Sequence, residues 1–313
     1  MADKATREAL GATLIELVDE GRDDIVVLDA DLAKATTTVK FRAAHPERFF
    51  DMGIAEQNMI GTAAGLAAGG KTPFASSFAV FATGRVYDQV RNSVCYANLG
   101  VKIAATHAGV TVGPDGGSHQ MLEDIALMRV LPNMTVLVPA DFTAACACVR
   151  LAADVPGPVY LRLGRPAVPQ LYEEGFEFSV GRAYVLREGT DVTLAACGVM
   201  VARALAAADL LAAEGVSAEV VDVMSLKPLD AETILSSARK TGAVVTCEEH
   251  SIIGGLGSAV ATLLATEHPV PMEQVGVSDV FGTSGEPEAL MEHFGLTASH
   301  IAESARRAVS RAS

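Results

Sequence analysis

Short runs of hydrophobic, often β-branched residues alternate with Ala-rich segments along the chain. Six runs in the first half predict buried strands, at 24–32, 48–54, 72–78, 101–108, 134–141 and 158–164. Four segments between them predict helices, at 55–69, 84–98, 119–130 and 142–153. Strands that are hydrophobic almost without interruption and alternate with helices are typical of a parallel sheet covered on both faces.

The pattern breaks once and then restarts. Segment 165–182 (RPAVPQLYEEGFEFSVGR) combines prolines, acids and aromatics and predicts a linker. Strands are predicted again at 191–197, 217–224, 243–249 and 274–280, with helices at 199–214, 230–240, 255–266 and the C-terminus. The sequence therefore predicts an α/β protein of two doubly wound domains, each a mostly parallel sheet flanked by helices. We expect domains at 1–165 and 185–313, with a linker at 166–184.

Composition and charge narrow the classes of partner. The chain has 313 residues, 50% of them hydrophobic, which is enough for two buried cores. The net charge of -14 disfavours non-specific binding to nucleic acids or anionic membranes. The N-terminus is an acidic amphipathic helix rather than a signal peptide, and no apolar run reaches the roughly 20 residues of a membrane span. We therefore expect neither a nucleic-acid nor a membrane partner.

The cysteines indicate a reducing compartment. There are five, scattered along the chain, at positions 95, 146, 148, 197 and 247. The C-x-C spacing of Cys146 and Cys148 suits neither a zinc knuckle nor a redox pair. Buried, reduced thiols in a cytoplasmic protein are the simpler interpretation.

The predicted helix 55–69 begins with one carboxylate, Glu56, followed by mostly small or apolar residues. The positive end of the helix dipole favours an ionised Glu56, whereas apolar burial favours the neutral acid. Such a carboxyl could share a proton with a basic ring nitrogen, and an acid that only caps or solvates the helix is the alternative. Gly61, Gly65 and Gly69 share one face of this helix, which suits either a subunit interface or close packing on the sheet.

The segment THAGVTVGPDGGSHQ (106–120), here called the histidine loop, follows the fourth predicted strand. Ligands of doubly wound sheets gather at the carboxyl ends of strands. His107 and His119 can donate or accept protons near neutral pH, and the glycines allow the backbone to approach a ligand closely. No Cys or third His stands at ligand spacing, so we expect no metal ligands in this chain. Turn and capping roles are the alternative for the loop taken alone.

Several stretches, in register, resemble one known family. IAEQNM (54–59), FAVFATGRVYDQ (78–89), the histidine loop and LPNMTVLVPAD (131–141) resemble the pyrimidine-binding domain of transketolases, which use thiamine diphosphate. CEEHSIIGGLGSAV (247–260) and VFGTSGEPEALMEHFGL (280–296) resemble the transketolase C-terminal domain. The resemblance thus covers nearly the whole chain.

The resemblance implies how the cofactor would bind. Glu56 would bond the ring nitrogen of the aminopyrimidine and so activate the reactive thiazolium carbon, which belongs to the cofactor. Phe81, and secondarily Phe78, would form an aromatic wall against the pyrimidine, with ordinary core packing as the alternative. Asp31 would lie near the cofactor.

The resemblance also implies a sugar phosphate as substrate. His107 and Arg165, with Arg7, would meet the phosphate, because the planar guanidinium group suits phosphate oxygens. Arg162 is a competing phosphate candidate, and surface ion pairing is the alternative for Arg7 and Arg165.

The remaining implied roles concern the sugar itself. Asp115 would bind a sugar hydroxyl. His119 would bond the oxygen where charge develops, and it joins Glu56 and His107 as a candidate catalytic residue.

One expected part of the family pattern is missing. No GDG motif followed by an Asn, the site that holds magnesium and the diphosphate, occurs in the sequence. The chain also has about half the length of a complete transketolase. It resembles the C-terminal subunit of a split transketolase, which would pair with an N-terminal subunit carrying that motif, two of each chain forming a heterotetramer. The expected reaction moves a two-carbon ketol unit from a ketose phosphate to an aldose phosphate.

Three alternatives stay open. The beta subunit of a 2-oxoacid dehydrogenase shares the two-domain plan but needs no histidine-rich sugar loop. A 1-deoxyxylulose-5-phosphate synthase has a similar loop in a longer chain. A non-catalytic regulatory subunit could keep the fold without the activity.

Overall fold

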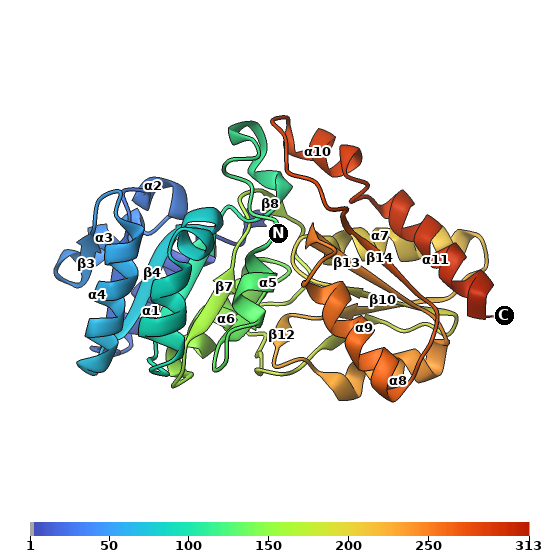
Figure 1. Ribbon diagram of the computed structural model, residues 1–313, viewed down its shortest axis with the longest axis horizontal. Coiled ribbons are helices and arrows are strands. Elements are labelled where there is room, and N and C mark those ends of the chain that lie inside the picture. The colour runs from blue at the N-terminus through green and yellow to red at the C-terminus, as the bar shows by residue number, and fades with distance from the viewer. Residues whose placement is uncertain (1–2, 313) are drawn as a thin grey trace.

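The computed structural model describes residues 3–312, which form two α/β units side by side (Figure 1). The first unit, here the N-terminal unit, contains β1 Lys4–Ala5, α1 Glu8–Asp19, β2 Ile25–Asp29, α2 Ala33–Thr36, α3 Val39–Ala44, η1 Pro46–Arg48, β3 Phe49–Asp51, α4 Glu56–Ala68, β4 Thr72–Phe78, η2 Val80–Gly84, η3 Gln89–Cys95, β5 Lys102–Thr106, η4 Val110–Asp115, α5 Asp124–Arg129, β6 Thr135–Leu137, α6 Phe142–Asp154, β7 Val159–Arg162 and β8 Ala167–Val168. The second, here the C-terminal unit, contains β9 Tyr184–Arg187, β10 Val192–Ala196, α7 Met200–Ala213, β11 Ala218–Asp222, β12 Ser225–Lys227, α8 Ala231–Thr241, β13 Val244–Ser251, α9 Leu256–Glu267, β14 Met272–Val277, α10 Pro287–His293 and α11 Ala298–Ala312.

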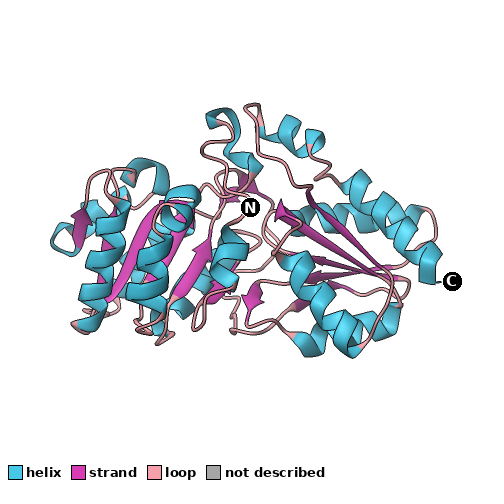
Figure 2. Cartoon of the chain, viewed as in Figure 1, coloured by secondary structure: helices cyan, strands magenta, loops and turns pink. Residues whose placement is uncertain are grey.

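Each unit is built on one mostly parallel sheet with helices on its faces, as Figure 2 shows in magenta and cyan. The seven-stranded sheet has the order β12-β6-β7-β5-β4-β2-β3, and the five-stranded sheet has the order β14-β13-β10-β11-β9. Only β12 and β9 pair antiparallel in them. Every residue of β2, β5, β10 and β11 is buried, as expected for strands covered on both faces. The predicted fold class is confirmed.

Some features departed from the sequence prediction. The predicted helix 84–98 contains a helix of the π type, η3, and a second π-helical segment, η2, ends where the predicted helix begins. Several short elements were not predicted, among them α2, α3, β9, β12 and α10. Strand β12 leaves its own unit to become an edge strand of the N-terminal sheet. Within the predicted linker, β8 pairs with β1.

Helix α4 shows one open face. Gly61 and Gly65 are exposed, and open space surrounds the position of a Cβ atom at each. The glycine face therefore does not pack on the sheet, which contradicts that interpretation. Between residues 3 and 312, no helix combines the length and hydrophobicity that crossing a bilayer requires.

Candidate functional site

The predicted site residues follow the carboxyl ends of neighbouring parallel strands. Glu56 follows β3, Phe81 follows β4, His107 follows β5 and Arg165 follows β7. These strands belong to one sheet, in which β7, β5, β4, β2 and β3 are successive neighbours. The topology thus brings side chains far apart in the sequence to one edge of the sheet.

Glu56 is the first residue of α4 and its side chain is only 3% exposed. With so little of its side chain exposed, Glu56 is not the solvated acid of the alternative interpretation. Its Oε1 instead accepts a hydrogen bond from Nη1 of Arg85 at 2.8 Å, and the Arg85 side chain is 46% exposed. A buried carboxylate is thus neutralised by one arginine at the surface of the site.

Arg85 was not among the predicted residues, yet it connects two of them. Its guanidinium carbon lies 4.2 Å from the centre of the Phe81 ring while the same group bonds Glu56. A guanidinium group is flat and attracted to an aromatic face. The only sequence signal was its position four residues after Phe81, a spacing that places side chains on one helix face.

Four rings extend this contact toward the histidine loop. Phe78 and Phe81 are nearly parallel, with centres 6.1 Å apart, and the His119 ring meets Phe81 edge-on at 5.5 Å. Phe78 also stacks on His107 at 3.9 Å. Phe81 and His119 are half-buried, so the ring cluster is partly open rather than sealed in the core.

His107 is held in a specific state. Its φ of 56° lies in the left-handed region that residues other than glycine rarely adopt. Its Nε2 lies 3.2 Å from Nη1 of Arg7, and its Nδ1 lies 2.9 Å from Oγ1 of Thr106. Because arginine only donates, Nε2 accepts and the ring proton belongs on Nδ1. Burial foremost, and then Arg7 and Arg165, lower the pKa of His107 to about 3, so its imidazole is neutral at physiological pH.

Arg7 and Arg165 place two positive charges beside this ring. Nη1 of Arg7 also donates to the Ala35 carbonyl at 2.8 Å, whereas its Nε is buried without a hydrogen-bond partner. Burial, and then repulsion by Arg165, lower the pKa of Arg7. Arg165 donates to the Val112 carbonyl and lies 3.1 Å from Oδ2 of Asp115. Two guanidinium groups with one nearby acid form a surface suited to an anion.

The alternative role for Arg162 as a phosphate ligand is wrong. Its side chain is 6% exposed and pairs with Asp124, from Nε to Oδ2 at 2.7 Å. Tyr160 donates to the same carboxylate oxygen at 2.6 Å. Arg162 is thus bound inside the protein, while Arg165, three residues later, reaches the surface.

Asp31 makes none of the contacts described above for the other candidate residues. It is exposed, with a φ of 60°, and its backbone N–H donates to Oδ1 of Asp51 at 3.1 Å. It lines a cavity of about 330 Å³ that also includes Ala35, whose carbonyl bonds Arg7. This cavity therefore adjoins the surface formed by Arg7 and Arg165.

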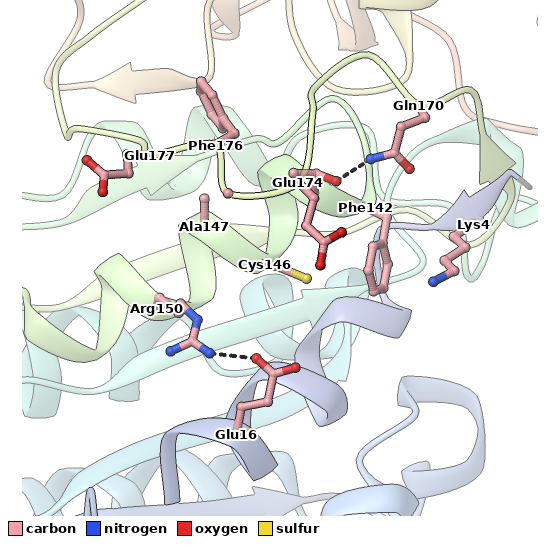
Figure 3. A pocket seen from close by; sticks show the side chains of 12 residues that line it. Lys4, Glu16, Phe142, Cys146, Ala147, Arg150, Gln170, Glu174, Phe176 and Glu177 are labelled. Atoms are coloured by element: carbon pink, nitrogen blue, oxygen red, sulfur yellow. Dashed lines mark hydrogen bonds and ion pairs between the residues drawn. The ribbon is translucent and has the colours of Figure 1, made fainter. Parts of the chain in front are cut away.

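A larger cavity, of about 730 Å³, lies between α1, α6 and segment 174–177 and contains none of the predicted residues (Figure 3). Phe142 and Phe176 contribute aromatic walls, with Arg150 and Glu16 joined at the rim. Cys146 lines it and is half-buried, while the other four cysteines are buried; all five are free. The expectation that every thiol is buried is thus wrong for Cys146.

No group of three or more His, Cys, Asp or Glu side chains within residues 3–312 is arranged to hold a metal ion.

Comparison with known families decides the relationship. Residues 2–170 match the family described as "Transketolase, pyrimidine binding domain", and residues 181–301 match "Transketolase, C-terminal domain". The chain belongs to the transketolase family. The resemblance predicted from the motifs is confirmed.

Relatives show which part of a transketolase this family member represents. It is 49% identical over 289 residues to a 6-deoxy-6-sulfo-D-fructose transketolase subunit, SqwH, of Clostridium sp. (strain MSTE9), covering 92% of this chain and 90% of that one. It is 38% identical to human transketolase over 98% of its own length but only 49% of the human chain. A solved structure described as "Split gene transketolase, inactive beta4 tetramer" is 55% identical, covers 100% of both chains and superposes with a TM-score of 0.92. The chain is therefore the C-terminal half of a split transketolase.

Proposed function

We propose that this chain binds the pyrimidine end of thiamine diphosphate and, together with an N-terminal partner subunit, transfers a two-carbon ketol unit from a ketose phosphate to an aldose phosphate. The partner would carry the magnesium and diphosphate site. When bound, the cofactor supplies the thiazolium carbon that carries the two-carbon unit. The residues of this chain bind, orient and exchange protons around it.

The contact between Glu56, Arg85 and Phe81 carries the proposal. The Arg85 guanidinium is a flat group with N–H donors that stacks on Phe81 and donates to Glu56. An aminopyrimidine is also flat, and its protonated ring nitrogen would donate to the same carboxylate. The two residues thus fit the group, and Arg85 has to move aside when the ring binds.

Glu56 is placed for proton exchange by its surroundings. Its side chain is almost wholly buried, which strengthens any hydrogen bond to its carboxylate relative to water. The neighbouring aromatic wall of Phe78 and Phe81 would exclude water from one face of the ring.

The charges of the substrate side favour a sugar with a terminal anionic group. Arg7 and Arg165 offer donors to such a group, and the neutral His107 would hold Arg7 in place by accepting its hydrogen bond at Nε2. The buried Nε of Arg7 has no hydrogen-bond partner of its own. Asp115, held by Arg165, would accept a bond from a sugar hydroxyl, and His119 would bond the oxygen where charge develops. A related subunit named for 6-deoxy-6-sulfo-D-fructose supports an anionic sugar as the substrate class.

Two observations support a second chain. Human transketolase is about twice as long, with this chain matching 49% of it. The exposed glycine face belongs to α4, the helix that begins with Glu56. A partner subunit that docks on this face would therefore lie next to the site and could close over it. We place two copies of each chain in the active assembly.

Mixing the purified chain with its N-terminal partner, thiamine diphosphate and magnesium tests this function. We expect two-carbon transfer between a ketose phosphate and an aldose phosphate, followed by product chromatography, only when both chains are present. The matched control is each chain alone at the same total protein concentration. Full activity of this chain alone with cofactor and magnesium contradicts the proposal, and so does a mixed complex without transfer.

A further inference from the structure

The histidine loop is in contact with the C-terminal unit along much of its length. In Figure 1 the green loop at the top centre lies beside the red-orange segment that leads into α10. Nε2 of Gln120 donates to the Thr283 carbonyl at 2.9 Å, and Oγ of Ser284 donates to the Pro114 carbonyl at 2.7 Å. The loop that carries both candidate histidines is therefore shaped by two units of the protein.

Glu249, near the end of β13, also contacts the histidine loop, through its side chain. Its side chain is buried, and its Oε1 accepts a hydrogen bond from the backbone N–H of Thr111 at 2.6 Å. Gly109 has a φ of 82°, and a Cβ atom at that position would lie 2.2 Å from Cδ of Glu249. The carboxyl group thus occupies space that only a glycine leaves open.

The backbone of Glu249 is fixed from the other side by Arg162. Nη2 of Arg162 donates to the Glu249 carbonyl at 2.9 Å, and its Nε pairs with Asp124, the first residue of the helix after the histidine loop. Burial raises the pKa of the Glu249 carboxyl to about 7, against the opposing effect of Arg162. Glu249 is therefore held through its backbone carbonyl by Arg162 of β7 and through its carboxyl group by Thr111 of the loop.

The backbone of His107 needs neighbouring groups to hold its conformation. Its left-handed backbone conformation is unfavourable for a residue with a Cβ atom and persists only where the surroundings hold it. Gly109 lies two residues after His107, and its backbone N–H donates to the Met121 carbonyl at 3.0 Å. This hydrogen bond joins the two ends of the histidine loop. Glu249 contacts the loop at Gly109 and at Thr111, directly next to this hydrogen bond.

We propose that Glu249 is a positioning residue by which the C-terminal unit fixes the histidine loop in its sugar-binding conformation. The proposal deepens the proposed function and rests on it for its kinetic consequences. Glu249 does not touch the cofactor side formed by Glu56 and Phe81. Replacing Glu249 is therefore expected to lower kcat/KM for the sugar substrates and to leave the affinity for the cofactor unchanged.

Steady-state kinetics of the assembled two-chain enzyme test this with Glu249→Ala and Glu249→Gln. We expect kcat/KM for the sugar phosphates to fall about 100-fold in Glu249→Ala, since a displacement of about 1 Å in a positioned group has effects of that size. We expect partial rescue in Glu249→Gln, because its amide oxygen still accepts from Thr111. The affinity for thiamine diphosphate should stay within error of the parent. Equal losses of cofactor and sugar binding would indicate a merely structural role and overturn the proposal, as would unchanged sugar kinetics.

A matched control and a second readout separate this proposal from the function itself. Glu248 is also buried on β13 but accepts from the backbone N–H groups of Leu256 and Gly257 at 2.7 and 2.8 Å. We expect Glu248→Gln to change thermal stability more than sugar kinetics. Hydrogen exchange at the Thr111 amide should be faster in Glu249→Ala than in the parent, whatever the activity. Unchanged exchange overturns the positioning role, whereas absence of ketol transfer in the parent complex overturns only the function.

Discussion

Glu56→Gln in the assembled two-chain enzyme is expected to lower kcat by about 10²- to 10⁴-fold, the range over which a positioned acid or base acts. The amide keeps the shape of the side chain and can still bond a ring nitrogen, but it cannot share a proton with it. KM for the sugars should change far less, because the sugar-side residues are untouched. Stopped-time product assays at saturating cofactor measure both quantities.

The control for Glu56→Gln is the same substitution at Glu267, which is exposed at the end of α9 in the C-terminal unit. Glu267→Gln should retain parental kcat. If Glu56→Gln also retains near-parental kcat while the cofactor is saturating, Glu56 is not the residue that acts on the pyrimidine.

Arg165→Ala is expected to raise KM for a ketose phosphate by about 10- to 100-fold, because a hydrogen bond to a charged group contributes about 1.5–3 kcal/mol. Arg7→Ala should act in the same direction. KM for an unphosphorylated ketose should be unaffected, since the lost donors have no anion to bind there. Initial-rate measurements with the two donors in parallel test the difference.

Arg306, which pairs with Glu214 at the surface on α11, offers a matched arginine far from the site. Arg306→Ala should leave KM unchanged for both donors. Equal effects of Arg165→Ala on the phosphorylated and unphosphorylated donors would mean that Arg165 supports the loop through Val112 and Asp115 rather than binding the anion.

The sheet strands were predictable because parallel strands buried on both faces leave a strong hydrophobic signal. Strand β12 is three residues long and pairs with a strand of the other unit, so nothing local in its sequence marks it. Segment 84–98 was predicted as a helix, but its π type was not predicted. A π-helical turn depends on backbone register that the apolar pattern does not encode.

The candidate residues that lie within the recognised motifs could be named from the sequence, but their contacts could not. The order of the strands brings Phe78, His107 and His119 into one ring cluster. Sequence spacing could not separate Arg162 from Arg165, because burial of Arg162 depends on Asp124 from a different segment. The partnership of Glu56 with Arg85 and the contact of Glu249 with the histidine loop also join distant segments, and no single stretch of sequence contains them.

A crystal structure of the two chains assembled with thiamine diphosphate tests the central claim most directly. We predict the Glu56 carboxylate within about 2.6–3.2 Å of the pyrimidine ring nitrogen, the ring against Phe81, and Arg85 displaced from both. A bound cofactor whose pyrimidine lies elsewhere, with Glu56 still paired to Arg85, would contradict the account.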